Sequence, residues 1–232
     1  MHRAAVRHLK RVDPKLASVI ARVGPCRLAP LNDGLHFDHI VRAIIYQQLS
    51  GLAARTIHTR FRELYGGRTP TPQELLATPD ERLRSVGLSR QKLSYLKDLA
   101  ARVSAAEVPL ETLHELPDDE VVAALTRVKG IGRWTAQMFL MFRLGRPDVL
   151  PDLDLGIQKG IKLAYGLRKL PTPKQVLKIG ARWEPYRTVA SWYLWRSLEH
   201  PPVPTTAPTA ATRTPKPRAR GRPASTPDKR SR

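Results

Sequence analysis

The stretch 125–134 reads Leu-Thr-Arg-Val-Lys-Gly-Ile-Gly-Arg-Trp, and the expected fold depends on it. Glycine has no Cβ and tolerates positive φ, so Gly130 and Gly132 permit a tight turn that presents backbone N–H groups outward. A helix expected from Arg133 onward adds its partial positive charge at that turn. The pattern predicts a helix-hairpin-helix that binds the phosphates of a nucleic acid, and an ordinary interhelical glycine turn is the alternative. The residues expected to contact the backbone of DNA are Lys129, Gly130, Ile131, Gly132 and Arg133.

The charge of the chain also indicates nucleic acid. Its 232 residues include 40 Lys and Arg against 20 Asp and Glu, which gives a formal net charge of +20. Contacts of Lys and Arg with phosphates release counterions, so a polyanionic partner is expected. Ribosomal and histone-like proteins would share this charge, so composition predicts a class of partner and no chemistry.

Residues 201–232 differ in composition from the rest. They hold 8 Lys and Arg and 8 Pro, without an aromatic residue. Such a stretch buries too little apolar surface to offset the entropy of ordering, so a disordered, basic, Pro-rich tail is expected. It either tethers the protein to DNA or acts as a solubilising extension. Residues 1–200 keep 32 basic against 19 acidic residues, so the folded part is basic in its own right.

Cysteine content and hydropathy exclude several classes of protein. Cys26 is the only cysteine, which excludes an intramolecular disulfide, a four-cysteine zinc site and a four-cysteine iron–sulfur cluster. No apolar run reaches the roughly 18 residues of a membrane span, and the start lacks the apolar stretch of a secretory signal. A cytoplasmic protein is therefore expected.

Helical patterns run along residues 1–200 and strand patterns are nearly absent, so the expected fold class is all-α. Asp13-Pro14 is typical of a helix start, with a capping side chain before a proline at the first position. Apolar residues recur at helical spacing over 37–65, long enough to expect a break near Ser50-Gly51. Further helix starts are expected at Thr71-Pro72, Thr78-Pro79, Ser89, Arg133 and Thr172-Pro173. Asp118 is expected to open a helix over 119–127, and 26–36 could hold a short extended piece.

Two carboxylates follow the hairpin. Asp152 and Asp154 lie two residues apart, directly before a helical pattern over 155–165. Taken alone, Asp154 is an ordinary N-cap of that helix.

Four motifs in this order resemble the helix-hairpin-helix (HhH-GPD) DNA glycosylase superfamily. They are the segment 44–50, the hairpin 130–136, Asp154 at 20 residues after Trp134, and the segment 182–187. The similarity spans roughly residues 10–198 and is greatest to the AlkA-type DNA-3-methyladenine glycosylase II branch, in a short form without the amino-terminal β domain.

The resemblance implies two helical lobes with the cleft for DNA and the base between them. Lobe one is expected at about 38–142 and lobe two at about 1–37 plus 143–200, followed by the tail.

The resemblance also implies how the reaction is carried out. Asp154 matches the family's single catalytic Asp, and Asp152 is the alternative. A fixed carboxylate suits the reaction because departure of the base leaves positive charge on the deoxyribose. Trp134 stands where bifunctional relatives carry a lysine, and an indole cannot form the Schiff base of a lyase. A monofunctional glycosylase without AP-lyase activity is implied.

Two further sets of residues follow from the same resemblance. The base pocket is implied at Trp134, Trp195 and Met138, where aromatic rings favour bases made cationic by alkylation. Met138 replaces an aromatic residue of the family, and helix packing is the alternative role of Trp195. Gln48 and Leu49 match the intercalating wedge that fills the space of a flipped base, and Leu49 could instead be a core leucine.

No cofactor is required for catalysis according to the resemblance, and no Fe–S cluster is implied. A structural K⁺ or Na⁺ is implied at the hairpin, on the backbone carbonyls of Thr126, Val128 and Ile131.

The implied function is base excision repair of double-stranded DNA. The protein would flip out alkylated bases of the 3-methyladenine and 7-methylguanine type and hydrolyse the N-glycosidic bond. It is expected to be a monomer without a membrane partner, cytoplasmic and, in a bacterium, associated with the nucleoid. One alternative is a glycosylase of the same fold for deaminated or mismatched bases. Another is a non-catalytic helix-hairpin-helix protein, for which a carboxylate beside DNA would have no use.

Overall fold

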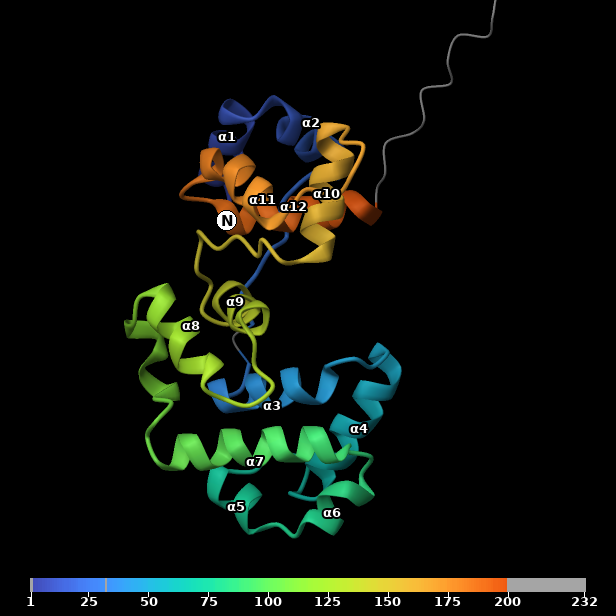
Figure 1. The fold of residues 1–232 in the computed structure, drawn as a ribbon, viewed down its shortest axis with the longest axis vertical. Coiled ribbons are helices and arrows are strands. Elements are labelled where there is room, and N and C mark those ends of the chain that lie inside the picture. The colour runs from blue at the N-terminus through green and yellow to red at the C-terminus, as the bar shows by residue number, and fades with distance from the viewer. Residues whose placement is uncertain (1, 32, 200–232) are drawn as a thin grey trace, which may run out of the picture. The chain divides into compact units, whose positions relative to one another are not determined.

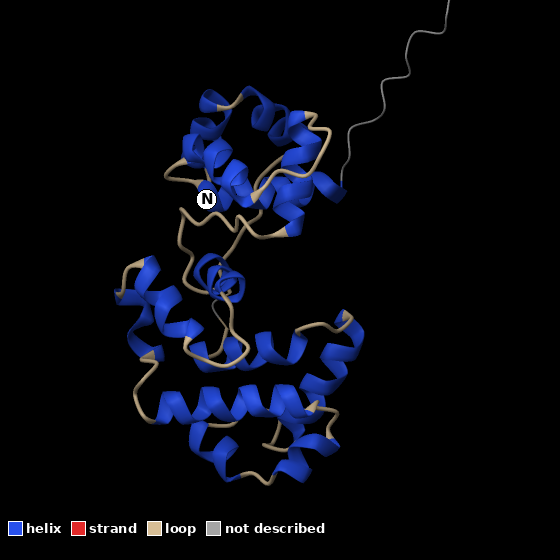
Figure 2. Cartoon of the chain, viewed as in Figure 1, coloured by secondary structure: helices blue, strands red, loops and turns tan. Residues whose placement is uncertain are grey.

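The computed structural model describes residues 2–31 and 33–199. Within them the chain forms twelve α-helices, two short 3₁₀ helices and no strand (Figure 2). The all-α prediction is confirmed, and the short extended piece expected in 26–36 is not a strand among the described residues there. The predicted tail, 201–232, lies outside the described part of the chain.

The helices form two groups, with α9 (Arg133–Phe142) between them (Figure 1). One group joins the beginning of the chain to its end and consists of α1 (Arg3–Val12), α2 (Pro14–Val23), α10 (Leu155–Tyr165), α11 (Pro173–Gly180), η2 (Ala181–Trp183) and α12 (Arg187–Glu199). The other group consists of α3 (His36–Tyr46), α4 (Gly51–Glu63), α5 (Pro72–Ala77), α6 (Asp80–Ser85), α7 (Arg90–Ser104), η1 (Leu110–Glu115) and α8 (Asp118–Thr126).

Each group has its own apolar core. The core beneath α3, α7 and α8 contains Ile44, Leu96 and other fully buried aliphatic residues. The second core is centred on Trp183, which is 0% exposed. Phe142 at the end of α9 and Trp195 on α12 pack against both cores, so these two helices join the groups.

Most of the predicted helix starts are confirmed, because the expected side chain accepts the first free N–H group. Asp13 accepts from the backbone of Lys15 at the start of α2, and the long pattern over 37–65 breaks between Tyr46 and Gly51. Side-chain caps are also found at Ser50, Thr71, Ser89, Asp154 and Thr172.

Two predicted starts are wrong by one residue. Thr78 does not cap α6, because its hydroxyl donates back to Glu74 O at 2.7 Å and so closes the end of α5. Pro79 is the N-cap residue instead. Asp118 is the first residue of α8 rather than its cap, since its carboxylate forms an ion pair with Arg146 at 3.3 Å.

Asp13 is a buried carboxylate that ties three helical segments together. Asp13 is only 1% exposed to solvent. Besides the two N–H groups of α2, it accepts from the hydroxyl of Tyr165 and from Nε1 of Trp183 at 2.8 Å. Burial and the neighbouring Asp13 carboxylate raise the pKa of Tyr165, which therefore remains a donor at neutral pH. The four donors satisfy a charge that would otherwise be costly to bury.

Arg143, directly after α9, holds the segment that leads into α3. Its guanidinium donates to the carbonyls of Leu31, Asp33 and Gly34 at 2.6, 3.1 and 2.6 Å. Its Nε donates to Nδ1 of His36 at 2.9 Å, which requires that nitrogen to be unprotonated. Burial and, next, the charge of Arg143 lower the pKa of His36.

Stability should therefore decrease in mildly acidic solution, in part because of His36. The free imidazole titrates near 6.5 and the folded one lower, so the unfolded chain binds the proton more readily as the pH falls through that interval. His36→Asn keeps an acceptor for Arg143 without a titrating group. The difference in free energy of unfolding between about pH 8 and about pH 5 should be smaller in this variant than in the wild type, measured by urea titration. An equal pH dependence of the two proteins would contradict the assignment.

Candidate active site and DNA interface

Asp154 is the N-cap residue of α10, and three N–H groups hold its carboxylate. Oδ1 accepts from the backbone of Ile157 at 2.8 Å and from Nε1 of Trp195 at 2.9 Å. Oδ2 accepts from Nε1 of Trp134 at 2.7 Å. The carboxylate is thus an N-cap, as the sequence pattern alone suggests, and it is also the meeting point of two indoles from α9 and α12.

Gly156 makes the approach of Trp195 possible. A Cβ at this position would lie 2.7 Å from a ring carbon of Trp195 and 2.9 Å from Oδ1 of Asp154. Any larger residue at position 156 would therefore displace the indole from the carboxylate.

The loop 145–154 that carries Asp154 is held by α9. The backbone N–H of Arg146 donates to Leu140 O at 2.9 Å, and the Gln137 amide donates to Leu150 O at 3.3 Å. Asp152 is 3% exposed, and its Oδ1 lies 2.9 Å from Nη2 of Arg133. Asp152 is therefore engaged in an ion pair with the first residue of α9, whereas Asp154 faces the two indoles.

The hairpin 127–132 joins α8 to α9. Gly130 has a φ of 78°, in the region that favours glycine, and Ile131 N donates to Val128 O at 3.1 Å to close the turn. Gly132 is the N-cap residue of α9. Lys129 is exposed, and Arg133, predicted to contact phosphates, shares its guanidinium with Asp152.

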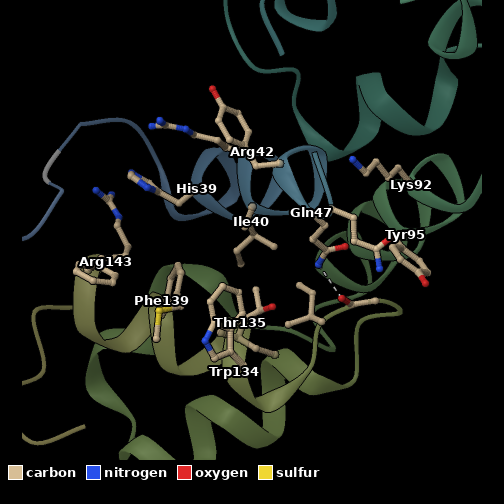
Figure 3. Close-up of a pocket in the computed structure, with 18 of the residues that line it drawn as sticks. His39, Ile40, Arg42, Gln47, Lys92, Tyr95, Trp134, Thr135, Phe139 and Arg143 are labelled. Carbon is tan, nitrogen blue, oxygen red and sulfur yellow. Dashed lines mark hydrogen bonds between the residues drawn. The ribbon is translucent and has the colours of Figure 1, made fainter. Parts of the chain in front are cut away.

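The predicted wedge lies in the turn between α3 and α4. Gln48 has a φ of 55°, and Leu49 is 39% exposed, so it is not a core leucine. Leu52, three residues on, is 78% exposed. Nε2 of Gln47 donates to Gly130 O at 2.9 Å, which fastens this turn to the hairpin (Figure 3).

A cavity of about 770 Å³ opens beside the hairpin, between α3 and α9 (Figure 3). Its volume lies within the roughly 300–1,000 Å³ of small-molecule sites. Trp134 and Met138 line it, whereas Asp154 and Trp195 lie outside its wall. Trp134 is 46% exposed; it lines the cavity and also donates a hydrogen bond to the Asp154 carboxylate. Other aromatic residues of the wall are Tyr46, Tyr95, Phe139 and Phe142.

The cations of the cavity wall already have partners within the protein. Lys92 Nζ donates to Ile45 O at 2.6 Å, and Arg143 binds the carbonyls described above. The guanidinium of Arg42 lies 5.1 Å from the centre of the Tyr46 ring, a cation–π contact. The surface offered to a ligand is therefore mainly apolar and aromatic. Across residues 2–31 and 33–199, no group of three His, Cys, Asp or Glu side chains could hold a metal ion.

The sequence matches the model of a known protein family. The model of the "HhH-GPD superfamily base excision DNA repair protein" matches residues 41–185, which include the wedge turn, the hairpin and Asp154. The chain belongs to this superfamily. The resemblance derived from the four motifs is thereby confirmed. No helix in the described part of this HhH-GPD protein is long and apolar enough to cross a membrane.

Relatives and solved structures agree with this placement. DNA-3-methyladenine glycosylase 1 of Schizosaccharomyces pombe is 36% identical over 193 residues, which cover 82% of this chain and 85% of the relative. The structure of the S. pombe 3-methyladenine DNA glycosylase with abasic DNA has a TM-score of 0.74 at 35% identity and covers 84% of this chain and 97% of that one. DNA-3-methyladenine glycosidase of Bacillus halodurans has a TM-score of 0.76 at 36% identity, over 83% and 88% of the two chains.

The structure brings part of the predicted site together. Trp134 and Trp195 meet at Asp154, and the wedge turn contacts the hairpin through Gln47. The roles of these residues remain predictions. Sequence reasoning did not identify the supports of the site. These are Arg133 with Asp152, Gln137 with Leu150, and two residues of α7: Tyr95, which packs against Gly130, and Asp98, which accepts from the backbone N–H of Lys129. Only the spacing of Asp98 and Arg102, four residues apart on one helix, could have indicated a pairing.

Proposed function

We propose that this HhH-GPD protein is a monofunctional DNA glycosylase that removes alkylated bases from double-stranded DNA in base excision repair. The observation that carries the proposal is the carboxylate of Asp154, fixed by two indoles and a helix N-terminus, next to an aromatic cavity and a glycine hairpin. The names of the relatives, which are 3-methyladenine glycosylases, support the substrate class. The protein acts as a monomer on chromosomal DNA, in the cytoplasm of the cell or on the nucleoid of a bacterium.

In the proposed reaction the C1′–N bond breaks and its electron pair leaves with the base. Alkylation at N3 of adenine or N7 of guanine makes the base cationic, so it departs as a neutral molecule. The positive charge left on the deoxyribose is stabilised by the nearby Asp154 carboxylate. Water then adds to C1′, and loss of its proton gives the abasic sugar.

The other predicted residues act on the DNA rather than on the bond. Trp134 and Met138 contact the flipped base from the cavity wall and Trp195 contacts it from beside Asp154, while Leu49 with Gln48 fills the gap that the base leaves in the stack. The hairpin 129–133 binds phosphates through the N–H groups that Asp98 and the turn itself leave open, and through the cations of Lys129 and Arg133. Because Trp134 has no amine, no Schiff base forms and the strand stays intact.

The test is base release from duplex DNA that carries N-methylated purines. We expect free methylated base and abasic sites, with strand nicks appearing only after alkaline treatment. Nicks without that treatment would contradict the monofunctional assignment. Release of deaminated but not methylated bases would overturn the substrate class. Binding of DNA without any release would leave only a DNA-binding function.

A monovalent cation at the hairpin is a further part of the proposal. The carbonyls of Thr126, Val128 and Ile131 are hard oxygen donors that suit K⁺ or Na⁺ and could bridge the ion to a phosphate. Val128 O accepts one N–H group and keeps a second lone pair free for an ion. DNA affinity should be higher in potassium chloride than in tetramethylammonium chloride of equal ionic strength, and equal affinity would contradict the site.

Removal of residues 201–232 should separate binding from catalysis. The tail carries 8 Lys and Arg, so its loss should weaken binding to undamaged DNA at low salt and reduce the salt dependence of the affinity. Base release from a short duplex at saturating protein should remain within about twofold of the wild type, because residues 1–201 form one compact unit. Loss of release by a folded 1–200 fragment would refute this division.

A further inference from the structure

One face of α7 supports both segments that the proposed function places on DNA. Lys92, Tyr95, Asp98 and Arg102 recur three or four residues apart, which puts them on the same side of the helix. Lys92 binds the carbonyl of Ile45, near the wedge turn. The next two residues of this face, Tyr95 and Asp98, reach the hairpin.

Asp98 accepts a hydrogen bond from the backbone of the hairpin. Its Oδ2 lies 2.8 Å from the N–H nitrogen of Lys129 and 3.0 Å from Nε of Arg102, while Oδ1 lies 3.8 Å from Nζ of Lys129. The side chain is 13% exposed. Burial acts to raise the pKa of Asp98, but the Lys129 N–H and the Arg102 guanidinium outweigh it, so the pKa is lowered.

Arg102 is in turn fixed by the segment between α7 and η1. Its Nη1 donates to Glu107 at 2.7 Å, and the carbonyl of Glu107 accepts from Arg127 at 3.3 Å. Asp98 therefore belongs to a short chain of contacts that runs from α7 to both sides of Val128. The orientation of its carboxylate is determined before any ligand arrives.

Tyr95 supports the hairpin at Gly130. A Cβ built on Gly130 would overlap the Tyr95 ring, so glycine is required here for packing as well as for its φ of 78°. The Tyr95 hydroxyl accepts from Gln91 at 2.6 Å, and the carbonyl of Gly130 accepts from Gln47. Figure 3 draws the Gln47 hydrogen bond as a dashed line.

We infer that Asp98 is a positioning residue that presets the hairpin for DNA, by holding the N–H group of Lys129 and with it the orientation of the turn. The inference rests on the proposed function, in which the hairpin grips the DNA backbone. The charge of Asp98 by itself opposes DNA binding, because a carboxylate beside the hairpin repels the phosphates of the DNA. The two effects have opposite signs, so they can be told apart by experiment.

The experiment compares Asp98→Ala and Asp98→Asn with Asp80→Asn in the full chain. Asp80 is a matched control because it forms an ion pair at 3.6 Å with Lys97, which lies on α7 as Asp98 does. Asp80→Asn changes the net charge by the same amount as Asp98→Asn, and Asp80 does not contact the hairpin. The dissociation constant for an undamaged duplex is measured over a range of salt concentrations. Amide hydrogen exchange at Lys129 and base release at saturating protein are measured beside it.

Asp98→Ala should weaken binding about tenfold, although it makes the protein more cationic. Asp98→Asn keeps one oxygen for the Lys129 N–H, so its affinity for DNA should fall less than that of Asp98→Ala. Asp80→Asn should bind DNA as tightly as the wild type or up to about twofold more tightly. Exchange at Lys129 should be faster in the alanine variant, and base release at saturation should stay within about twofold of the wild type.

Affinity of both Asp98 variants equal to or tighter than that of the Asp80 control would overturn the inference. So would an unchanged exchange rate at Lys129. If Asp98→Ala does not fold, the asparagine variant decides by the same comparison. Because undamaged DNA is the probe, failure of this inference is distinct from failure of the proposed function, which shows as absence of base release by the wild type.

Discussion

Asp154→Asn is expected to lower the rate of base release at saturating protein by at least about 100-fold, because it removes the charge that stabilises the developing positive sugar. The fold should survive the change. Asparagine is as good an N-cap as aspartate, and its Oδ1 can still accept from Ile157 and Trp195. The measurement is single-turnover release from methylated duplex, together with the affinity for undamaged DNA, which should not fall.

The matched control is Asp119→Asn, which removes one charge from an exposed residue of α8. It should release bases at the wild-type rate. If Asp154→Asn retained release within about tenfold of the wild type, the role of the carboxylate would have to move, first to Asp152. The ion pair of Asp152 with Arg133 makes that side chain a support of the loop rather than a free charge in the site.

Asp13→Ala should destabilise the protein by about 3–5 kcal/mol, among the largest effects expected of a single substitution here. It removes the cap of α2 and leaves two donors without their acceptor, the buried Nε1 of Trp183 and the partly buried hydroxyl of Tyr165. Each buried donor left unpaired costs about 1–3 kcal/mol, and the lost cap about 0.5–2 kcal/mol. The free energy of unfolding in urea is the measurement.

Tyr165→Phe is the matched comparison, because it removes one of the four donors and leaves the carboxylate in place. Its destabilisation should be smaller, about 1–2 kcal/mol. A destabilisation by Asp13→Ala of less than about 1 kcal/mol would mean that water replaces the carboxylate among these donors.

The features that sequence analysis predicted correctly are local ones. Asp13-Pro14 and Thr172-Pro173 specify helix starts through a capping oxygen and a fixed φ, which act within four residues of chain. The hairpin at Gly130 and the cap at Asp154 are of the same kind. The error at Thr78 arose because a threonine can donate backward to the preceding helix as readily as it can cap the next one.

The supports of the site could not be predicted, because they pair residues far apart in the chain. Asp98 lies 31 residues from Lys129, and Asp13 lies 170 residues from Trp183. No periodicity relates such positions, since their meeting depends on how the helices pack. The double role of Asp154, as cap and as partner of two indoles, likewise depends on α9 and α12 arriving at the same point.

The position of α9 bears on how substrate range could diversify. Trp134 and Met138 line the cavity and are only partly buried, whereas Ala136, Leu140 and Met141 on the same helix are almost fully buried. The partly exposed wall residues of α9, Trp134 and Met138, are thus distinct from its fully buried residues, although Phe139 belongs to both the wall and the core. Random libraries restricted to positions 134, 135 and 138 should therefore yield mostly folded proteins with altered lesion preference, and the same diversity at 136, 140 and 141 should yield mostly insoluble ones.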